Sequence, residues 1–492
     1  MSDLLIFLVL LPLVAIFVIP LASHRWPNRK YRFISGIEAP LEHLLTLGFS
    51  TVTLILSLYV AALGVGAANF VEHAFYIVES YPWIEGFVSL TLAADMFSSV
   101  MLILASLLTI MASLASLGYI ETEHTKYNIL MMLFLAGING VFLSFNLIFF
   151  YIFWELVLVP MFFFILRWGG PNRTYAAYKF LIFTHAGSVV MLVGFMALFS
   201  YVTPNTFEAF DLVGRIPAWL LLPVWLSFFA GFAVKVPIVP LHTWLPDAHV
   251  EAPSPISVLL AGLLLKMGGY GLLRYTFLLF SEIWELLSPY LLALGILTAV
   301  YGAIVAATQV DMKRLIALTS ISHMGFVVLG VGAGNTLGVS GAVFQMFSHG
   351  LISASLFILS GVIPKVAGSR NIPELKGLGS RRWTSGTLLF ASVAAFGFPG
   401  LSGFVGEFLT IFGALERSLL TAVSVAAPAI AMAYFTWMLF NTIFAEEDLT
   451  SSARETFGLV LPVVLLSILI AVLGIFPHII LDYLSPYVSL FG

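Results

Sequence analysis

The chain contains no cysteine and very few charged residues. Of its 492 residues, 9% are Asp, Glu, Lys or Arg and 60% are hydrophobic, and the mean hydropathy is +1.05. A soluble domain carries about 25% charged residues, so this composition predicts an integral membrane protein with little mass outside the bilayer. The lack of cysteine excludes thiolate-bound iron–sulfur clusters, thiolate zinc sites and disulfides within the chain.

Sequence motifs for nucleotides, metals and nucleophilic catalysis are also missing. The chain has no P-loop, no HExxH pair and no nucleophile elbow. The glycine-rich run at 330–334 lies at the end of an apolar segment, not in the strand–turn–helix setting of a dinucleotide site. We therefore expect no cofactor and no metal in this chain. The net charge of −4 gives no indication of nucleic-acid binding.

Long apolar segments predict an all-α membrane fold. A membrane-spanning helix needs about 20 apolar residues, and roughly fourteen segments meet this length. The first has no basic residues before it and is long enough to span, so we expect a retained helix rather than a cleaved signal. The predicted spans are 3–22, 43–65, 91–118, 127–145, 147–167, 176–201, 219–242, 255–279, 288–307, 315–333, 339–363, 384–414, 419–444 and 456–480.

Lysine and arginine are distributed unevenly among the loops. Most of the 21 lie in or beside loops that follow odd-numbered spans, from Arg25 to Arg454, whereas Arg215, Arg274 and Arg417 lie beside the others. Cytoplasmic loops carry the excess of positive charge. With an even number of spans, this places both termini on the outer side of a prokaryotic cell membrane. The loop 70–87 has Glu72, Glu79 and Glu85 and no Lys or Arg, as an outer loop would.

The stretch 229–274 carries the strongest functional signal. Two apolar segments are joined by a polar, proline-rich turn, and each contains one lysine, Lys235 and Lys266. Pro237 and Pro240 follow the first lysine, and proline breaks the helical hydrogen-bond ladder. In lipid, an interruption of the helical hydrogen bonds is tolerated only where the backbone is buried in protein or lines a water-filled cavity. The sequence therefore predicts a broken membrane helix with a lysine at the break.

The alternative is that these lysines extend to the headgroups, as lysines near helix ends usually do. Both lysines lie well inside their segments, with apolar residues on either side. A buried, unpaired lysine costs a few kcal/mol, and a buried lysine loses its proton readily. The two positions together indicate an ion or proton path.

Further titratable residues lie within predicted spans. Glu155 is surrounded in sequence by aromatic and aliphatic residues, and Glu407 follows a Gly-Phe-Pro-Gly run that should break span twelve. A lone buried histidine is more often structural. However, His323 and His349 follow two buried lysines, and histidine titrates near neutrality, so a functional role is favoured. His185 lacks such company and is expected to be structural.

The two predicted breaks also indicate internal symmetry. The broken spans, 219–242 and 384–414, are five apart in the chain, and paired broken helices are a sequence sign of inverted repeats around a site at mid-membrane depth. We therefore expect two inverted five-helix repeats. The predicted units are three N-terminal helices, a first repeat, a second repeat and a C-terminal helix, at residues 1–118, 119–280, 281–445 and 446–492 respectively.

At these residues the chain resembles a known family. The segment KVPIVPLHTWLPDAH at 235–249, continued by Glu251-Ala-Pro and by LKMGGYG at 265–271, resembles the signature of the antiporter-like membrane subunits of respiratory complex I and related complexes. The likeness is strongest to the branch of subunit M (subunit 4 in mitochondria) and covers roughly spans three to fourteen. The resemblance implies fourteen helices with two inverted five-helix repeats, in agreement with the pattern above.

The resemblance also implies a proton path with one role for each of six residues: Glu155 and Lys235 as the interacting pair of the input half-channel, Lys266 as the central lysine, His323 and His349 as polar groups along the membrane mid-plane, and Glu407 as the terminal group of the output half. Sister subunits usually have lysine at the last position, so glutamate favours subunit M. The run Ala93–Ser98 departs from the family pattern, which leaves the contact made by this helix open.

Two main functions are consistent with this pattern. The first is a proton-translocating membrane-arm subunit of an oxidoreductase, without a redox site of its own, assembled with sister antiporter-like subunits in lipid. Its electrons would come from NADH or another donor. The alternative is a subunit of a redox-independent cation/proton antiporter of the same fold. A purely structural scaffold is a weaker third possibility. Glu407 and the overall pattern favour the first function.

Overall fold

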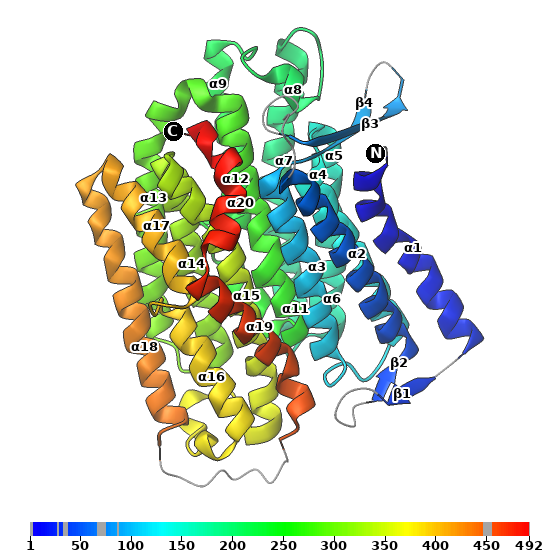
Figure 1. Cartoon of the computed structure of the whole chain (residues 1–492), viewed down its shortest axis with the longest axis vertical. Coiled ribbons are helices and arrows are strands. Elements are labelled where there is room, and N and C mark those ends of the chain that lie inside the picture. The colour runs from blue at the N-terminus through cyan, green and yellow to red at the C-terminus, as the bar shows by residue number, and fades with distance from the viewer. Residues whose placement is uncertain are drawn as a thin grey trace.

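Helices that run roughly parallel to one another form almost the whole chain in the computed structural model (Figure 1). The structure describes residues 3–26, 29–32, 38–65, 75–85, 88–445 and 455–491. Glu72 and Arg454, which entered the prediction of sidedness, lie outside these residues. The N- and C-termini lie at the same end of the bundle, the upper end in Figure 1. This position fits the predicted placement of both termini on one side, without saying which side that is.

The N-terminal part contains two small β-hairpins that the all-α prediction misses. Its elements are α1 (Leu4–Arg25), β1 (Lys30–Arg32), β2 (Glu38–Pro40), α2 (Leu41–Val65), β3 (Ile77–Ile84), β4 (Val88–Ala94), α3 (Met96–Ser116) and α4 (His124–Leu143). Both hairpins are antiparallel, β1 with β2 and β3 with β4.

The predicted span 91–118 therefore starts too early, because its first residues belong to β4. The helix begins after Asp95, whose side chain accepts a hydrogen bond from the Ser98 backbone N–H. The Ser98 hydroxyl in turn accepts one from the Asp95 backbone N–H, which completes a capping box.

The middle of the chain forms α5 (Leu147–Leu156), α6 (Leu158–Trp168), α7 (Arg173–Tyr201), α8 (Ala209–Leu212), α9 (Ala218–Lys235), α10 (Trp244–Glu251), α11 (Ser254–Leu259), the π-helix η3 (Leu260–Leu264) and α12 (Leu265–Phe280). The remainder forms α13 (Trp284–Ala307), α14 (Met312–Ala333), α15 (Thr336–Ala367), α16 (Arg382–Ala395), α17 (Ser402–Arg417), α18 (Ala426–Thr442), α19 (Phe457–Ile475) and α20 (His478–Val488), with short 3₁₀ turns between some of them.

Twelve of the described helical stretches are long and apolar enough to cross a membrane. This count is lower than the predicted fourteen for two reasons. The stretch Ser254–Ala307 is continuous and covers two predicted spans. The predicted span 384–414 is divided between α16 and α17, each too short to cross alone. The structure therefore supports an integral membrane bundle, and the count of fourteen stays a prediction.

The predicted break in span seven is present, and so is that in span twelve. The helix α9 ends at Lys235, two residues before Pro237, and α10 starts at Trp244. The helix α16 ends at Ala395, and α17 starts at Ser402. The intervening Gly397 and Gly400 have φ of +73° and +90°, a region that disfavours residues with a Cβ.

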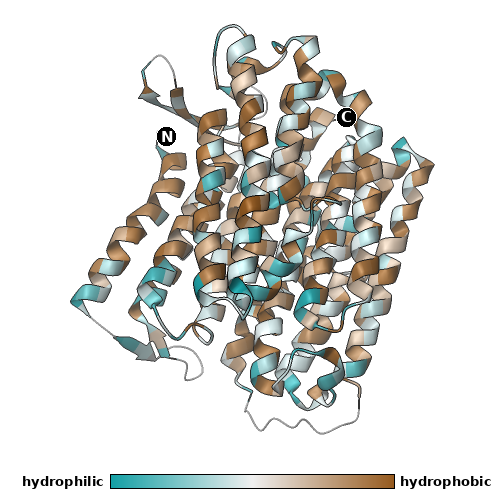
Figure 2. Cartoon of the chain, turned by 180° about the vertical axis from the view of Figure 1, so that it is seen from behind, coloured by the Kyte–Doolittle hydropathy of each residue, from teal (hydrophilic) through white to brown (hydrophobic). Residues whose placement is uncertain are grey.

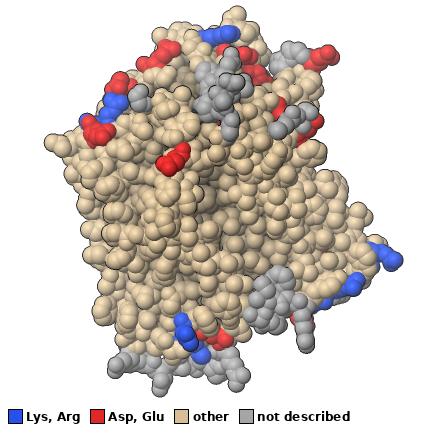
Figure 3. Space-filling model, in the orientation of Figure 1, with Lys and Arg blue, Asp and Glu red and all other residues tan. Residues whose placement is uncertain are grey.

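The helices α14 and α15 form the centre of the bundle, because the most apolar stretch of each is completely buried. The outer helices, such as α1, α2 and α18, expose many large apolar side chains, as lipid-facing helices do. Hydrophobic residues dominate these outer helices, while hydrophilic residues concentrate at the ends and on some interior helices (Figure 2). On the face shown in Figure 3, Lys, Arg, Asp and Glu lie mostly toward the two ends, with an almost uncharged belt between them.

Arg274 is the clearest departure from the predicted loop positions. It was expected beside a loop, but it lies in α12 with a side chain that is 4% exposed, and it makes a two-pronged ion pair with Asp95 at 2.5 and 2.7 Å. Five aromatic rings have their centroids 5.1–5.3 Å from its guanidinium carbon: Phe75, Phe97, Phe145, Tyr270 and Tyr487. This pair joins the N-terminal helices to α12, and it is the contact that the departure at Ala93–Ser98 left open.

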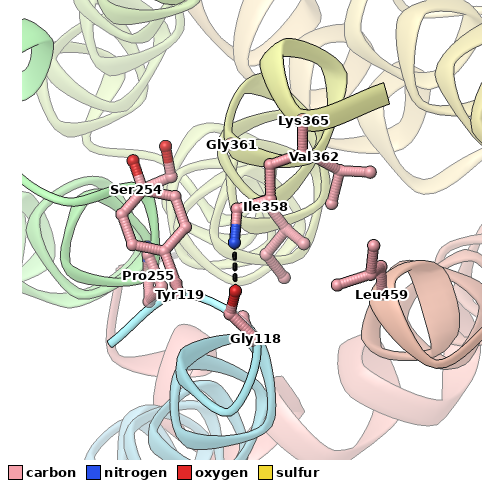
Figure 4. Close-up of a pocket in the computed structure, with 10 residues that line it drawn as sticks. Gly118, Tyr119, Ser254, Pro255, Ile358, Gly361, Val362, Lys365 and Leu459 are labelled. Carbon is pink, nitrogen blue, oxygen red and sulfur yellow. Dashed lines mark hydrogen bonds between the residues drawn. The ribbon is translucent and has the colours of Figure 1, made fainter. Parts of the chain in front are cut away.

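A second polar contact joins α3 to α15. It lies at the C-terminal end of α3, opposite to the end that Asp95 caps. The Lys365 ammonium donates a hydrogen bond to the carbonyl of Gly118, just beyond α3, and lies 4.8 Å from the centre of the Tyr119 ring (Figure 4). The contact borders a small cavity of about 20 Å³ that Ser254 and Leu459 also line. Lysine near a helix C-terminus satisfies carbonyls that have no partner within the helix, so Lys365 closes the end of α3.

We predict that Arg274→Met strongly destabilises the protein. Removing one partner of a buried ion pair leaves an unpaired buried charge and costs about 3–5 kcal/mol. Arg417→Met is the matched control, because Arg417 pairs with the exposed Glu285 at 3.2 Å and such surface pairs contribute about 0–1 kcal/mol. Thermal unfolding in detergent should show a large fall for Arg274→Met and little change for Arg417→Met. Equal unfolding temperatures for the two variants would contradict the structural role of the pair.

Candidate functional site

The six predicted site residues lie on six different helices. Glu155 is near the end of α5, Lys235 is the last residue of α9, and Lys266 is the second residue of α12. The others lie on three helices of the second half: His323 on α14, His349 on α15 and Glu407 on α17. All except Glu155 are buried.

Lys235 lies at the break of its helix, as the prolines predict. The break removes helical partners from the last carbonyls of α9, and the Trp244 indole N–H donates to the carbonyl of Val234 at 2.9 Å. The helix α12 passes very close, since a Cβ added to Gly268 would lie 2.8 Å from the Cβ of Lys235. The lysine is therefore held between the two half-helices and α12.

The Lys235 ammonium has no hydrogen-bond partner among the described residues, although it is completely buried. Its nearest aromatic contacts are the rings of Trp154 and Phe180, with centroids 5.4 and 5.9 Å from Nζ. Cation–π contacts of this kind contribute about 0.5–2 kcal/mol, whereas an unpaired buried charge is far more costly. Lys235 therefore lies in a site that offers its ammonium only partial compensation.

Glu155 does not contact Lys235 directly. Its carboxylate binds Nδ1 of His185 at 2.7 Å and also accepts a hydrogen bond from the Ser188 hydroxyl. The Glu155 side chain is 23% exposed and lies at the outer surface of the bundle, beside an open cavity of about 530 Å³. His185 was expected to be structural because, unlike His323 and His349, it does not follow buried lysines. The sequence analysis did not foresee its contact with Glu155, because residues i and i+30 on neighbouring helices give no periodic signal.

Lys266 lies directly after a π-helical turn, Leu260–Leu264. Such turns occur mostly as single insertions in α-helices and are frequent at functional sites, because they distort the hydrogen-bond ladder. The Lys266 ammonium donates to the carbonyl of Ala261 at 2.6 Å and contacts Nδ1 of His349 at 2.5 Å. The distorted turn thus supplies a carbonyl to a fully buried amine.

The two histidines continue from Lys266 toward Glu407. The rings of His349 and His323 meet edge to face with centroids 5.2 Å apart. Nε2 of His323 lies 3.5 Å from Oε1 of Glu407 and 3.0 Å from the carbonyl of Ala395, the last residue before the break in span twelve. The structure therefore brings Lys266, His349, His323 and Glu407 together as one row of side chains.

Ser348 and Ser402 lie next to this row and are joined by a hydrogen bond of 2.7 Å between their hydroxyls. Ser402 starts α17, so this bond joins α15 to the second half of the broken span.

His249 was not among the predicted residues. It is completely buried, stacks on Phe357 at 4.6 Å, and neither ring nitrogen has a partner among the described residues. His249 is the last residue of the 235–249 segment, and this position is the sequence signal that could have identified it.

Two details of the structure concern the surroundings and the position of Glu407. Phe408 and Phe412 stack on each other at 4.3 Å but are exposed, so they line the outer face of α17 and do not enclose the carboxylate. The carboxylate instead faces inward, toward His323. In addition, Lys235 ends the first half of its broken helix, whereas Glu407 lies in the second half of its own. The two residues therefore do not occupy matching places relative to their breaks.

Among the residues that the structure describes, no group of three or more His, Asp or Glu side chains could hold a metal ion. The site is thus a set of buried titratable side chains on broken or distorted helices. Side chains of this kind, spaced by hydrogen bonds or short gaps, can pass protons along a row.

We predict that Gly397→Ala disturbs Glu407. A Cβ at this position would lie 2.5 Å from Oε2 of Glu407, and the φ of +73° adds about 1–2 kcal/mol of backbone strain. The carboxyl C=O stretch of Glu407, assigned with Glu407→Gln in pH-difference infrared spectra, should shift in this variant.

Two glycines provide controls for Gly397→Ala. Gly400 has φ of +90° but open space around its Cβ position, so Gly400→Ala imposes the strain without the clash. Gly386 on α16 has neither feature. If Gly400→Ala shifts the Glu407 band as much as Gly397→Ala, the contact between Gly397 and Glu407 has no effect of its own.

Comparisons with known proteins agree with this geometry. Residues 144–474 match the family model described as NADH:quinone oxidoreductase/Mrp antiporter, transmembrane. The chain is 38% identical over 463 residues to NADH-quinone oxidoreductase subunit M of Rhodobacter capsulatus, covering 89% of this chain and 88% of the relative. It is 40% identical over 419 residues to the same subunit of Escherichia coli strain K12, covering 82% of each.

Solved structures give the same result. A chain of respiratory complex I from Thermus thermophilus with bound NADH has a TM-score of 0.86 at 28% identity, covering 99% of this chain and all of the other. A chain of the Mrp complex from Dietzia sp. DQ12-45-1b has a TM-score of 0.85, but at 19% identity this likeness concerns the fold alone. The matched residues include all six site residues. The chain therefore belongs to the NADH:quinone oxidoreductase/Mrp antiporter family of transmembrane proteins.

Proposed function

We propose that this chain is a proton-translocating membrane-arm subunit of a complex I-like NADH–quinone oxidoreductase, equivalent to subunit M. The observation that carries the proposal is the buried row from Lys266 through His349 and His323 to Glu407, with a contact of 2.5 Å at one end and 3.5 Å at the other. Membership of the family and the subunit M relatives support the specific complex.

In this proposal the six residues have the roles that the resemblance implies, and the contacts support the order in which the two histidines act. Glu155 and Lys235 form the input half, Lys266 passes the proton to His349, and His323 passes it to Glu407 for release. The proximity of His323 to the break in span twelve supports an exit there, because carbonyls at a break can bind water. The two broken helices likewise support two inverted five-helix repeats within fourteen spans, at residues 119–280 and 281–445.

The sidedness is part of the same proposal. The excess of Lys and Arg after odd-numbered spans supports termini on the outer side of a prokaryotic membrane. Glu407 would then release protons toward the outside. The chain would work within a membrane arm beside sister subunits, and it would take part in the oxidoreductase without carrying a redox group itself.

Substitutions at Glu407 test the release step. In the assembled complex in vesicles, we predict that Glu407→Ala lowers both proton pumping and quinone-linked turnover, because no group remains to accept a proton from His323. Glu407→Gln should have the same effect with intact assembly, since glutamine keeps the shape but cannot take up the proton. Glu407→Lys should be milder than Glu407→Ala, because an amine can still exchange protons.

The readouts are the pH change inside the vesicles and the rate of quinone reduction. Glu416→Gln is the matched control, because Glu416 lies on the same helix and contacts Asn335 at 2.7 Å, outside the row. Normal pumping at full turnover in Glu407→Ala would contradict the proposed role of Glu407.

A further inference from the structure

Glu155 has a partner that its expected role does not explain. The expected partner is Lys235, yet both carboxylate oxygens are occupied by α7: one by His185 and the other by Ser188. Lys235 is meanwhile buried with no hydrogen-bond partner among the described residues. The Glu155 carboxylate is thus held on the outer side of the bundle, whereas the Lys235 amine on the inner side has no carboxylate partner.

The two positions are close enough for an exchange. Trp154, the residue directly before Glu155, has its ring 5.4 Å from the Lys235 ammonium. The indole N–H of Trp154 also has no partner among the described residues. Successive residues of a helix differ in direction by about 100°, so Glu155 reaches the side of Lys235 by a change of rotamer and a modest rotation of the backbone.

The backbone at Glu155 can allow such a rotation. The helix is interrupted at Val157, between α5 and α6. Pro160 lacks the N–H that would bond the carbonyl of Leu156, and its ring crowds that carbonyl. The last turn of α5 therefore has fewer helical hydrogen bonds than a continuous span would have. Glu155 lies in this turn, directly before Leu156.

His185 determines which way the Glu155 carboxylate points. Its Nδ1 lies 2.7 Å from Oε2 of Glu155, and the Ser188 hydroxyl on the same helix donates to the other carboxylate oxygen. The His185 side chain is 54% exposed, so the pair with Glu155 is partly in contact with the surroundings of the bundle.

We propose that His185 is a positioning residue that holds Glu155 away from Lys235, and that Glu155 alternates between these two partners during translocation. This inference rests on the proposed function. A protonated His185 keeps the carboxylate on the outer side. When the proton moves from Nδ1 of His185 to Oε2 of Glu155, the products are a neutral imidazole and a neutral carboxylic acid. The acid then turns inward and gives the proton to the Lys235 amine, which leaves a carboxylate paired with an ammonium.

The surroundings of the pair are consistent with this exchange. The open cavity of about 530 Å³ beside Glu155 and His185 is otherwise lined by Tyr151 and by aliphatic side chains of α5, α6 and α7. Among the residues that the structure describes, Tyr151 and Lys235 are the other titratable groups that interact electrostatically with Glu155. The cavity therefore leaves His185 accessible from outside the bundle, and the aliphatic lining leaves few other groups to hold the carboxylate.

The test uses the assembled complex in vesicles with three variants of α7. His185→Leu removes the partner, and His185→Gln keeps a hydrogen-bond donor that cannot carry the proton. Ile182→Leu is the control, because Ile182 is 64% exposed on the same helix. We expect His185→Leu and His185→Gln to lower the number of protons pumped per electron at least two-fold, with normal assembly, and Ile182→Leu to leave it unchanged.

Two further measurements separate this inference from the proposed function. Glu155→Gln should impair pumping by itself, and the double variant Glu155→Gln with His185→Leu should be no worse than Glu155→Gln alone, because His185 acts through Glu155. The infrared C=O band of Glu155 should also shift in His185→Leu.

Each outcome has a defined meaning. Normal pumping in Glu155→Gln overturns the proposed input half. Impaired Glu155→Gln together with normal His185→Leu overturns the role of His185 alone. Full rescue by His185→Gln means that a hydrogen bond is enough, which also overturns the exchange of the proton at His185.

Discussion

The bilayer interior offers no water to a broken backbone or an unpaired charge, and this constraint explains how the chain is arranged. At the breaks in spans seven and twelve, side chains take over freed backbone carbonyls: Trp244 at the end of α9 and His323 at the end of α16. The buried charge of Arg274 is compensated by Asp95 and by a shell of aromatic rings. The titratable row from Lys266 to Glu407 lies on α12, α14, α15 and α17, and His323 joins it to the break between α16 and α17.

The irregular turns and the titratable residues support each other. A regular helix has no carbonyl to spare for a lysine, but the π-turn before Lys266 provides that of Ala261, and the end of α16 provides that of Ala395 to His323. Without these carbonyls, the buried amine and imidazole would rely on each other alone. The breaks thus reduce the cost of burying the polar groups, and the polar groups occupy the carbonyls that the breaks expose.

The sequence predicted the helical membrane fold, both breaks and the buried titratable residues, because apolar length, proline, glycine and buried charge are local signals. That Lys266, His323, His349 and Glu407 belong to one path was implied by the family resemblance. The sequence did not predict the hairpins or the exact helix starts, since the capping box at Asp95 competes with an apolar run that continues through β4. The pairs of Arg274 with Asp95 and of His185 with Glu155 could not be predicted either. Each joins residues far apart in sequence, 179 and 30 positions, and depends on which helix faces lipid.

The side chains of the site are not all in contact with one another. From Lys266 to Glu407 each side chain contacts the next or meets it ring to ring. At Lys235 the chain of contacts stops on both sides, since no hydrogen bond or ion pair joins it to another described residue. In the proposed proton path, a proton can therefore move from Lys266 to Glu407 without a large change in structure, whereas the step between Glu155 and Lys235 requires a side chain to turn. We therefore place the conformational step of the proposed path at Lys235 and Glu155, where the helices are interrupted.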